Sequence, residues 1–218
     1  ITQNKIQSIH ISLDEIKDKI DNFCKRDFYF FDNKMNFDIS SLTIKKNCII
    51  CKFDNIKSII FLDEGYIIYK LSNHNNIKVF FENKYPFHIN LLEYLLSLVT
   101  ESFDKEFNII FNTFINFDSK LEVNSNFLKL QTKLLNLAYR VKELQKVTED
   151  LIKNKKDIDD LTFEVFNSDE LEQMIENYNL KTDDIYNDIS KLLNEMDNIQ
   201  KIENIQLAKD RNKYALIN

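Results

Sequence analysis

The sequence predicts an α+β protein: a small antiparallel or mixed β-sheet with packed helices, then long antiparallel coiled-coil-like helices ending in a stalk helix. Gly65 and Pro86 are the only glycine and the only proline among 218 residues. Because these residues usually mark loops and helix ends, the stretch after Pro86 strongly favours helix. Short runs rich in β-branched and aromatic residues favour strands before it. The expected parts are an α+β subdomain at 1–86, helices packing on the sheet and a first coiled-coil arm at 87–167, and a long stalk helix at 168–218.

The first part is expected to hold one helix and six strands. Ser12-Leu13-Asp14-Glu15 fits a capping box, and apolar residues follow it at helical spacing as far as Phe23. Short turns at Lys46-Asn47 and Asp63-Glu64-Gly65 favour antiparallel pairing, with Gly65 free to adopt a positive φ. The expected strands are Phe28–Phe31, Leu42–Lys45, Cys48–Phe53, Ile59–Leu62, Tyr66–Tyr69 and Ile77–Phe81.

The second half carries apolar residues at helical spacing. Leu91 to about Phe117 is strongly apolar and is expected to pack on the sheet. Two later runs step by 3 and 4, which predicts a heptad seam on each of two antiparallel helices, joined by a connection within 153–169. The seams are Phe127, Leu130, Leu134, Leu137, Val141, Leu144, Thr148 and Leu151, then Leu171, Ile175, Tyr178, Thr182, Ile185, Ile189, Leu192, Met196 and Ile199.

The last helix changes character near its end. At 1.5 Å per residue, 168–218 would span roughly 75 Å, more than a compact domain needs, so we expect it to project from the body or to pack between subunits. The apolar stripe shifts to Ile202, Ile205 and Ala208, a three-residue stammer. Acidic residues dominate as far as Glu203, and basic residues follow. A basic end could face anionic lipid headgroups, or compensate the helix dipole if the helix stops there.

Composition excludes several classes of function. A formal net charge of −6 argues against a nucleic-acid partner, which normally meets a basic face. A single glycine rules out the glycine-rich phosphate loops and the nucleophile elbow, and no convergent catalytic set is visible, so an enzyme is not expected. Cys48 and Cys51 match C-x-x-C spacing, but in a strand they would point to opposite faces. No apolar run reaches the roughly 18 residues of a membrane helix.

Several segments, in order along the chain, resemble one family. Cys24-Lys25-Arg26-Asp27-Phe28 through Asp32 is similar to the family's Ala-Arg-Asp-Leu-Arg segment and the acid after it, and Lys45 to Tyr69 to its strand pair. Pro86-Phe87-His88 resembles its Pro-Phe-Glu start of a long helix. The later matches are Asp157–Thr162, Glu172 with Glu176-Asn177-Tyr178, and Asn204-Ile205-Gln206-Leu207 with Arg211-Asn212. The family is the CorA-type magnesium channels, mitochondrial branch, and the similarity is to their soluble N-terminal part.

The resemblance implies a homopentamer whose long helix lines a central funnel and continues into the membrane. The membrane helices and the family's Gly-Met-Asn filter would lie beyond Asn218, so this chain is expected to be a fragment of a longer protein. The implied location is the mitochondrial inner membrane, with this domain on the matrix side, or else another intracellular membrane or the plasma membrane. Two departures are Ala208, where the family usually has Asp, and Lys153-Asn154-Lys155-Lys156 in its usually acidic connection.

The resemblance also directs attention to Mg²⁺, as both a regulatory and a transported ion. Magnesium prefers hard oxygen ligands and keeps several waters, so one or two carboxylates per site can suffice. Two acidic sets are candidates; the alternative is a solvated acidic face. They are Asp157, Asp159 and Asp160, and then Asp169, Glu172 and Glu176. The family motif places Arg211 on the funnel-facing side, and helical spacing puts Ala208, Arg211, Ala215 and Asn218 on one face as candidate pore-lining residues.

Two functions therefore remain in competition. The first is the soluble regulatory domain of a magnesium channel, which forms the funnel and senses divalent cations. The second is a structural coiled-coil assembly protein with a small α+β head. Both account for the heptads, but only the first accounts for the basic C-terminal switch and the ordered motif matches. Under either one the chain is not expected to break a covalent bond.

Overall fold

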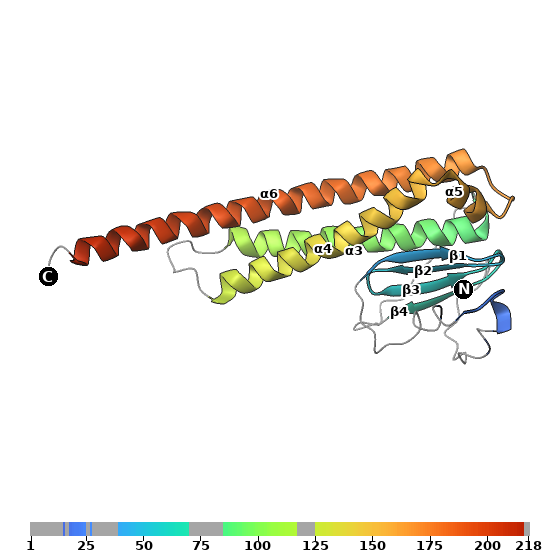
Figure 1. Cartoon of the computed structure of the whole chain (residues 1–218), viewed down its shortest axis with the longest axis horizontal. Helices are drawn as coiled ribbons and strands as arrows, with labels where there is room; N and C mark the ends of the chain where they lie inside the picture. Colours follow the sequence, from blue (N-terminus) through green and yellow to red (C-terminus); the bar gives the residue numbers. More distant parts are fainter. Residues whose placement is uncertain are drawn as a thin grey trace.

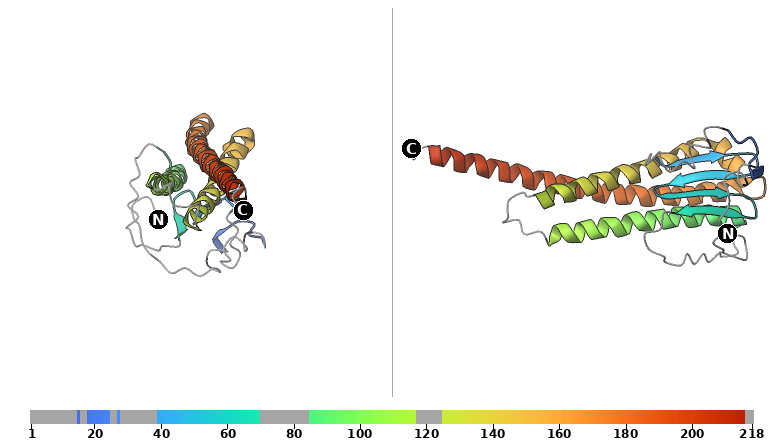
Figure 2. Two further views of the ribbon diagram at one scale, coloured as in Figure 1. Left: turned by 90° about the vertical axis from the view of Figure 1, so that its left-hand side faces the viewer. Right: turned by 90° about the horizontal axis from the view of Figure 1, so that it is seen from below.

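The computed structural model describes residues 15, 18–24, 27, 39–69, 85–116 and 125–215. It has the expected α+β architecture: a four-stranded sheet lies against one end of a set of long helices, and the last helix extends beyond the others (Figure 1). Figure 2 shows the same arrangement from two further directions, with the sheet beside the helices rather than in line with them. No helix in the described ranges is both long and apolar enough to span a bilayer.

The sheet is antiparallel throughout and follows the order of the chain. Its strands are β1 (Ser41–Ile44), β2 (Ile49–Phe53), β3 (Ile56–Ile60) and β4 (Gly65–Tyr69). These confirm four of the expected strands, although β3 begins and ends earlier than Ile59–Leu62. The expected strands at 28–31 and 77–81 lie outside the described residues, as does most of the predicted first helix, of which Glu15, Asp18 and Lys19 are helical.

Both faces of the central strands are buried. Cys51 and Phe53 of β2 face the helices, whereas Cys48 and Ile50 join Ile20 in a smaller cluster on the other side. The alternation of a strand therefore separates the two cysteines, as expected, and neither a disulfide nor a shared metal site can form between them. Burial raises the pKa of the Cys48 thiol to about 12, and that of Cys51 further still. These thiols are core residues.

Both predicted turns join antiparallel strands, but the backbone of Gly65 differs from expectation. Gly65 does not adopt a positive φ. It is required for a different reason: a Cβ there would collide with the Leu91 side chain of the helix that crosses the sheet. The positive φ occurs instead at Asp54, in the β2–β3 turn, with a φ of 52°. Asp tolerates this left-handed conformation better than most residues, which allows so short a connection.

Four helices follow the sheet. They are α3 (Phe87–Ile115), α4 (Ser125–Lys153), α5 (Lys155–Thr162) and α6 (Ser168–Ala215). The expected packing of α3 on the sheet is present, but α3 also packs along α4 and α6, so the long helices form a set of three (Figure 2). The expected connection within 153–169 contains α5 as a short helix of its own. The predicted stalk helix is continuous to Ala215, beyond which the residues are not described.

The two predicted seams form the core between α4 and α6. Every residue of the first seam is buried, and so is every residue of the second except Ile185 and Ile199, which are partly buried. Polar contacts fix an antiparallel register: the Thr148 hydroxyl bonds Asn179 Oδ1 at 2.8 Å, Gln145 donates to Asp183 at 3.1 Å, and Gln131 donates to Asp197 at 2.9 Å. In this register Val141 lies level with the Ile185–Ile189 segment.

Candidate functional site

The two acidic sets lie at the same end of the molecule. Asp157, Asp159 and Asp160 belong to α5, and Asp169, Glu172 and Glu176 occupy the first turns of α6, at the end opposite the projecting tip (Figure 1). Asp159, Asp160, Asp169 and Glu176 are exposed, and Asp157 and Glu172 are partly exposed. Since α5 packs on α6, the fold gathers these carboxylates at one end.

The start of α6 shows why some of these acids are there. Asn167 caps the helix: its side-chain oxygen accepts a hydrogen bond from the Asp169 amide at 2.9 Å, and its carbonyl accepts from Leu171. Asp169 and Glu170 fill the first turn, where negative charge is favourable beside unpaired N–H groups. Asp157 lies similarly in the first turn of α5. Helix stability thus accounts for part of each acidic set.

The carboxylates do not converge on one point. Within the residues that the structure describes, no group of three or more His, Cys, Asp or Glu side chains could hold a metal ion. Magnesium needs only one or two protein carboxylates when waters complete its shell. The acidic end of one chain thus offers separate exposed oxygens, which an ion could join across two copies.

The tip of α6 carries the candidate pore-lining residues. Ala208 and Arg211 are exposed, the side chain of Ala215 is not described, and Asn218 lies outside the described residues. The stripe that follows the stammer finds no cover within the described part of the chain: Ile202 and Ile205 are 63% and 56% exposed, and Ala208 is exposed as well. Leu207, on another side of the helix, is 53% exposed. Both figures show this part of α6 running on past the ends of α3 and α4 (Figures 1 and 2).

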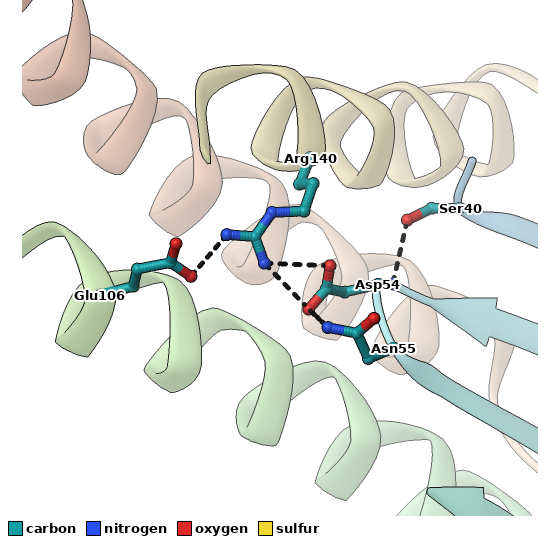
Figure 3. A network of polar contacts seen from close by, with 5 residues as sticks. All are labelled: Ser40, Asp54, Asn55, Glu106 and Arg140. Carbon is teal, nitrogen blue, oxygen red and sulfur yellow. Dashed lines mark hydrogen bonds and ion pairs between the residues drawn. The ribbon is translucent and has the colours of Figure 1, made fainter. Parts of the chain in front are cut away.

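A charged network that the sequence did not reveal joins the sheet to the helices (Figure 3). Arg140 of α4 donates from Nη1 to both carboxylate oxygens of Asp54, at 3.2 and 3.3 Å, and from Nη2 to Glu106 of α3. Its guanidinium also lies 5.6 Å from the ring centre of Phe103. Burial opposes the charge of Arg140, but its hydrogen bonds to Glu106 and Asp54 outweigh burial and raise its pKa.

This network has the geometry of a clamp. Asp54 occupies the β2–β3 turn, where its amide donates to Ser40 at 3.4 Å and its carboxylate accepts from Asn55 at 3.1 Å. One arginine thereby connects a turn of the sheet to two long helices. Only the Asp-Asn pair in the turn gives any local signal of it, because the partners are 86 and 34 residues apart in the chain.

A buried histidine marks the other end of α3. His88 is fully buried, and neither ring nitrogen has a hydrogen-bond partner among the described residues. Its ring meets Phe163, which ends α5 in a left-handed conformation, at 5.4 Å. Burial lowers the pKa of His88 to about 4, although the Thr162 backbone partly opposes the shift. The side chain is therefore a neutral polar group in the core.

Comparisons with known proteins assign no family to this chain. No protein-family model matches it, and no curated protein is significantly similar in sequence.

Proposed function

We propose that this chain is the soluble regulatory domain of a magnesium channel, and that it forms a funnel and senses divalent cations. The observation that carries the proposal is the shape and chemistry of α6. This helix is 48 residues long, it packs within the chain as far as Ile199, and its basic, apolar tip projects beyond the other helices. A helix that leaves its own domain in this way suits a connection to a membrane pore.

The acidic end of the bundle supplies a means of regulation. Exposed carboxylates on α5 and early α6 would repel those of a neighbouring copy, and Mg²⁺ bound between them would relieve that repulsion. An ion that binds the assembled, closed arrangement better than the open one shifts the population toward closure. No bond is broken in this process, so the domain needs no nucleophile or general base.

Arg211 is the residue by which the pore part of the proposal can be tested. In a homopentamer, five copies of this side chain would ring the funnel beside the membrane, in the mitochondrial inner membrane or another cellular membrane. Positive charge on a cation path raises the barrier to a divalent ion. The exposed position of Arg211 on the projecting part of α6 is compatible with this role.

The test uses the complete reading frame in a magnesium-uptake assay and in single-channel recording. The proposal expects two apolar stretches after residue 218, the first ending in Gly-Met-Asn, and Mg²⁺ uptake by the expressed protein. Arg211→Ser should change conductance or selectivity, whereas Lys209→Ser, off the predicted pore-lining face of the helix, should leave both unchanged. A reading frame without apolar stretches, or no uptake, refutes the channel.

A second function is favoured by one specific observation. The exposed stripe of Ile202, Ile205 and Ala208 is also what an extending coiled coil would offer to further helices. A structural coiled-coil assembly protein with a small α+β head would then use α6 as its rod. It predicts no ion flux and no apolar stretch after residue 218, so the same reading frame separates the two functions.

A further inference from the structure

Helix α4 has an apolar face, opposite its buried seam, that no other described part of the chain covers. Leu128, Leu135 and Tyr139 are 47%, 52% and 51% exposed, and their spacing of seven and four residues places them on one side of the helix. Their neighbours Thr132 and Lys146 are exposed on the same side. Single exposed leucines are ordinary, but three large apolar side chains aligned on one face form a surface suited to contact.

The charge around this face is basic. Residues 125–146 contain five Lys or Arg and one acidic residue, Glu143. All four lysines, Lys129, Lys133, Lys142 and Lys146, are exposed. Arg140 is engaged in the clamp, and Lys142 lies over the Tyr186 ring of α6 at 4.5 Å. Lys129 and Lys146 remain beside the apolar residues, whereas Lys133, seven residues before Arg140, lies on the side of the helix that carries the clamp. The α4 outer face (Leu128, Leu135 and Tyr139, with Lys129 and Lys146) is therefore apolar with a basic margin.

Helix α6 presents the opposite charge on its own exposed side. Residues 168–203 contain ten Asp or Glu and three Lys. Leu180 is exposed near the middle of this stretch, and Glu176 and Asp184 lie one turn to either side of it. Glu195 is also exposed further along. The α6 outer face, defined by Leu180, Asp184 and Glu195, has one apolar side chain and two acidic ones, and the exposed Lys191 on the same side is paired with Asp188 at 2.8 Å. This face is therefore complementary in charge to the α4 outer face.

We propose that the α4 outer face of one copy docks on the α6 outer face of a second copy of this chain. The charges decide the symmetry. A two-fold dimer through α4 would bring lysines against lysines, and one through α6 would bring carboxylates against carboxylates. Only the heterologous pairing of α4 with α6 joins unlike charges. Because each copy carries both faces, such a contact propagates head to tail and either closes into a ring or continues as a filament.

The pairing rests on the proposed function in one respect: a funnel requires several copies of this chain. The two functions proposed above differ in how the contact ends. A channel domain requires a closed ring, and so a mass that stops growing with protein concentration. A structural assembly protein is better served by an open filament, whose mass keeps increasing.

The test is sedimentation velocity on the 218-residue chain at low and high salt. The α4 reversal is Lys129→Glu with Lys146→Glu, and the α6 reversal is Asp184→Lys with Glu195→Lys. Each reversal alone should weaken self-association at least about tenfold, and the chain carrying both should recover to within about threefold of the wild type. The side chains changed are exposed, so circular dichroism should show unaltered folding in all three variants.

Two results overturn the docking surface. One is a wild-type chain that stays monomeric at low salt up to hundreds of micromolar protein. The Kd of any self-association would then be too weak for a specific interface. The other is a double reversal no better than the two single ones, because the contact would then not be the α4–α6 pairing. Leu135→Lys, which tests the apolar centre without reversing any existing charge, should also weaken association about tenfold or more.

Failure of the docking surface and failure of the channel proposal have different signatures. If the full reading frame conducts Mg²⁺ but the double reversal does not restore association, the channel stands and this surface is wrong. If the reversal pattern holds while uptake is absent, copies of the chain join as described but do not form a channel.

Discussion

Two stretches of α6 have similar apolar content but different surroundings. From Leu171 to Met196, nearly all the seam residues are buried against α4 and α3, while Ile202, Ile205 and Leu207 are more than half exposed. The break coincides with the stammer in the apolar period and with the change from acidic to basic charge. The comparison teaches that heptad character indicates contact but does not say with what: the first stretch is satisfied inside the chain, and the second is not.

The largest effect should come from deleting side chains on the packed side of this boundary. Leu137→Ala removes a fully buried side chain from the α4–α6 seam and should lower the free energy of unfolding by roughly 2–5 kcal/mol. The matched change Leu207→Ala, on the projecting stretch, should alter it by less than about 0.5 kcal/mol. Urea unfolding of the isolated chain measures both. Equal losses of unfolding free energy in the two variants would contradict the claim that only the first stretch is packed within the chain.

The stability of the folded chain should depend on pH because of His88, near the start of α3. Because its folded pKa of about 4 lies below the unfolded value of 6.5, the unfolded chain binds a proton first as pH falls. Stability from this group is complete above pH 6.5 and is lost toward pH 4, by about 3 kcal/mol for a shift of this size. His88→Phe keeps a ring without ionising, so its stability relative to the wild type should rise by that amount on acidification. Parallel profiles for the two proteins would contradict the assignment.

The clamp should contribute less than the seam, since it is partly solvated. Arg140→Met keeps much of the apolar stem but leaves Asp54, only 10% exposed, without its cation. We expect a loss of about 1–3 kcal/mol. Asp54→Asn in the same chain should recover part of it, because it removes the uncompensated charge. A double-mutant cycle gives the coupling energy, and a value near zero would mean that the sheet and helices are held together by apolar packing alone.

The smallest effect expected is that of magnesium on the isolated chain. If the Mg²⁺ concentration is about ten times the Kd of the site, binding adds about 1.4 kcal/mol to the free energy of unfolding. This should appear as a small rise in melting temperature. Sodium at matched ionic strength is the control, because screening acts without specific binding. Asp157→Asn with Asp160→Asn, and separately Glu172→Gln with Glu176→Gln, should each reduce the rise. Identical shifts with both salts would leave the acidic sets as solvated helix ends.

Most of the architecture could be predicted from the sequence, because the spacing of apolar residues and the positions of Gly and Pro are local signals. The seams through Leu137 and Ile189, the continuous helix from Ser168, and the antiparallel strands at Cys48–Phe53 and Tyr66–Tyr69 follow from spacing alone, and all of these are present. The scarcity of Gly and Pro was informative for the same reason, since few other residues end a helix so reliably.

What could not be predicted depends on contacts between distant residues. The role of Gly65 is set by the approach of Leu91, and that of Arg140 by partners in a turn and another helix. The ring of His88 meets Phe163, 75 residues further along the chain at the end of α5, and nothing in the local pattern indicates this contact. For the candidate site, the sequence identified the acids and the basic tip, but no single-chain pattern could show whether carboxylates from different copies meet.

Hydrogen exchange along α6, measured at increasing protein concentration, tests the central claim most directly. If residues 171–199 are stabilised within the chain, their amides should be protected equally at all concentrations. Residues 202–213 should exchange rapidly in the monomer and become protected only as copies assemble. Protection of the tip in the monomer, or rapid exchange of the tip in the assembled protein, would contradict the claim that this stretch is completed by contacts outside its own chain.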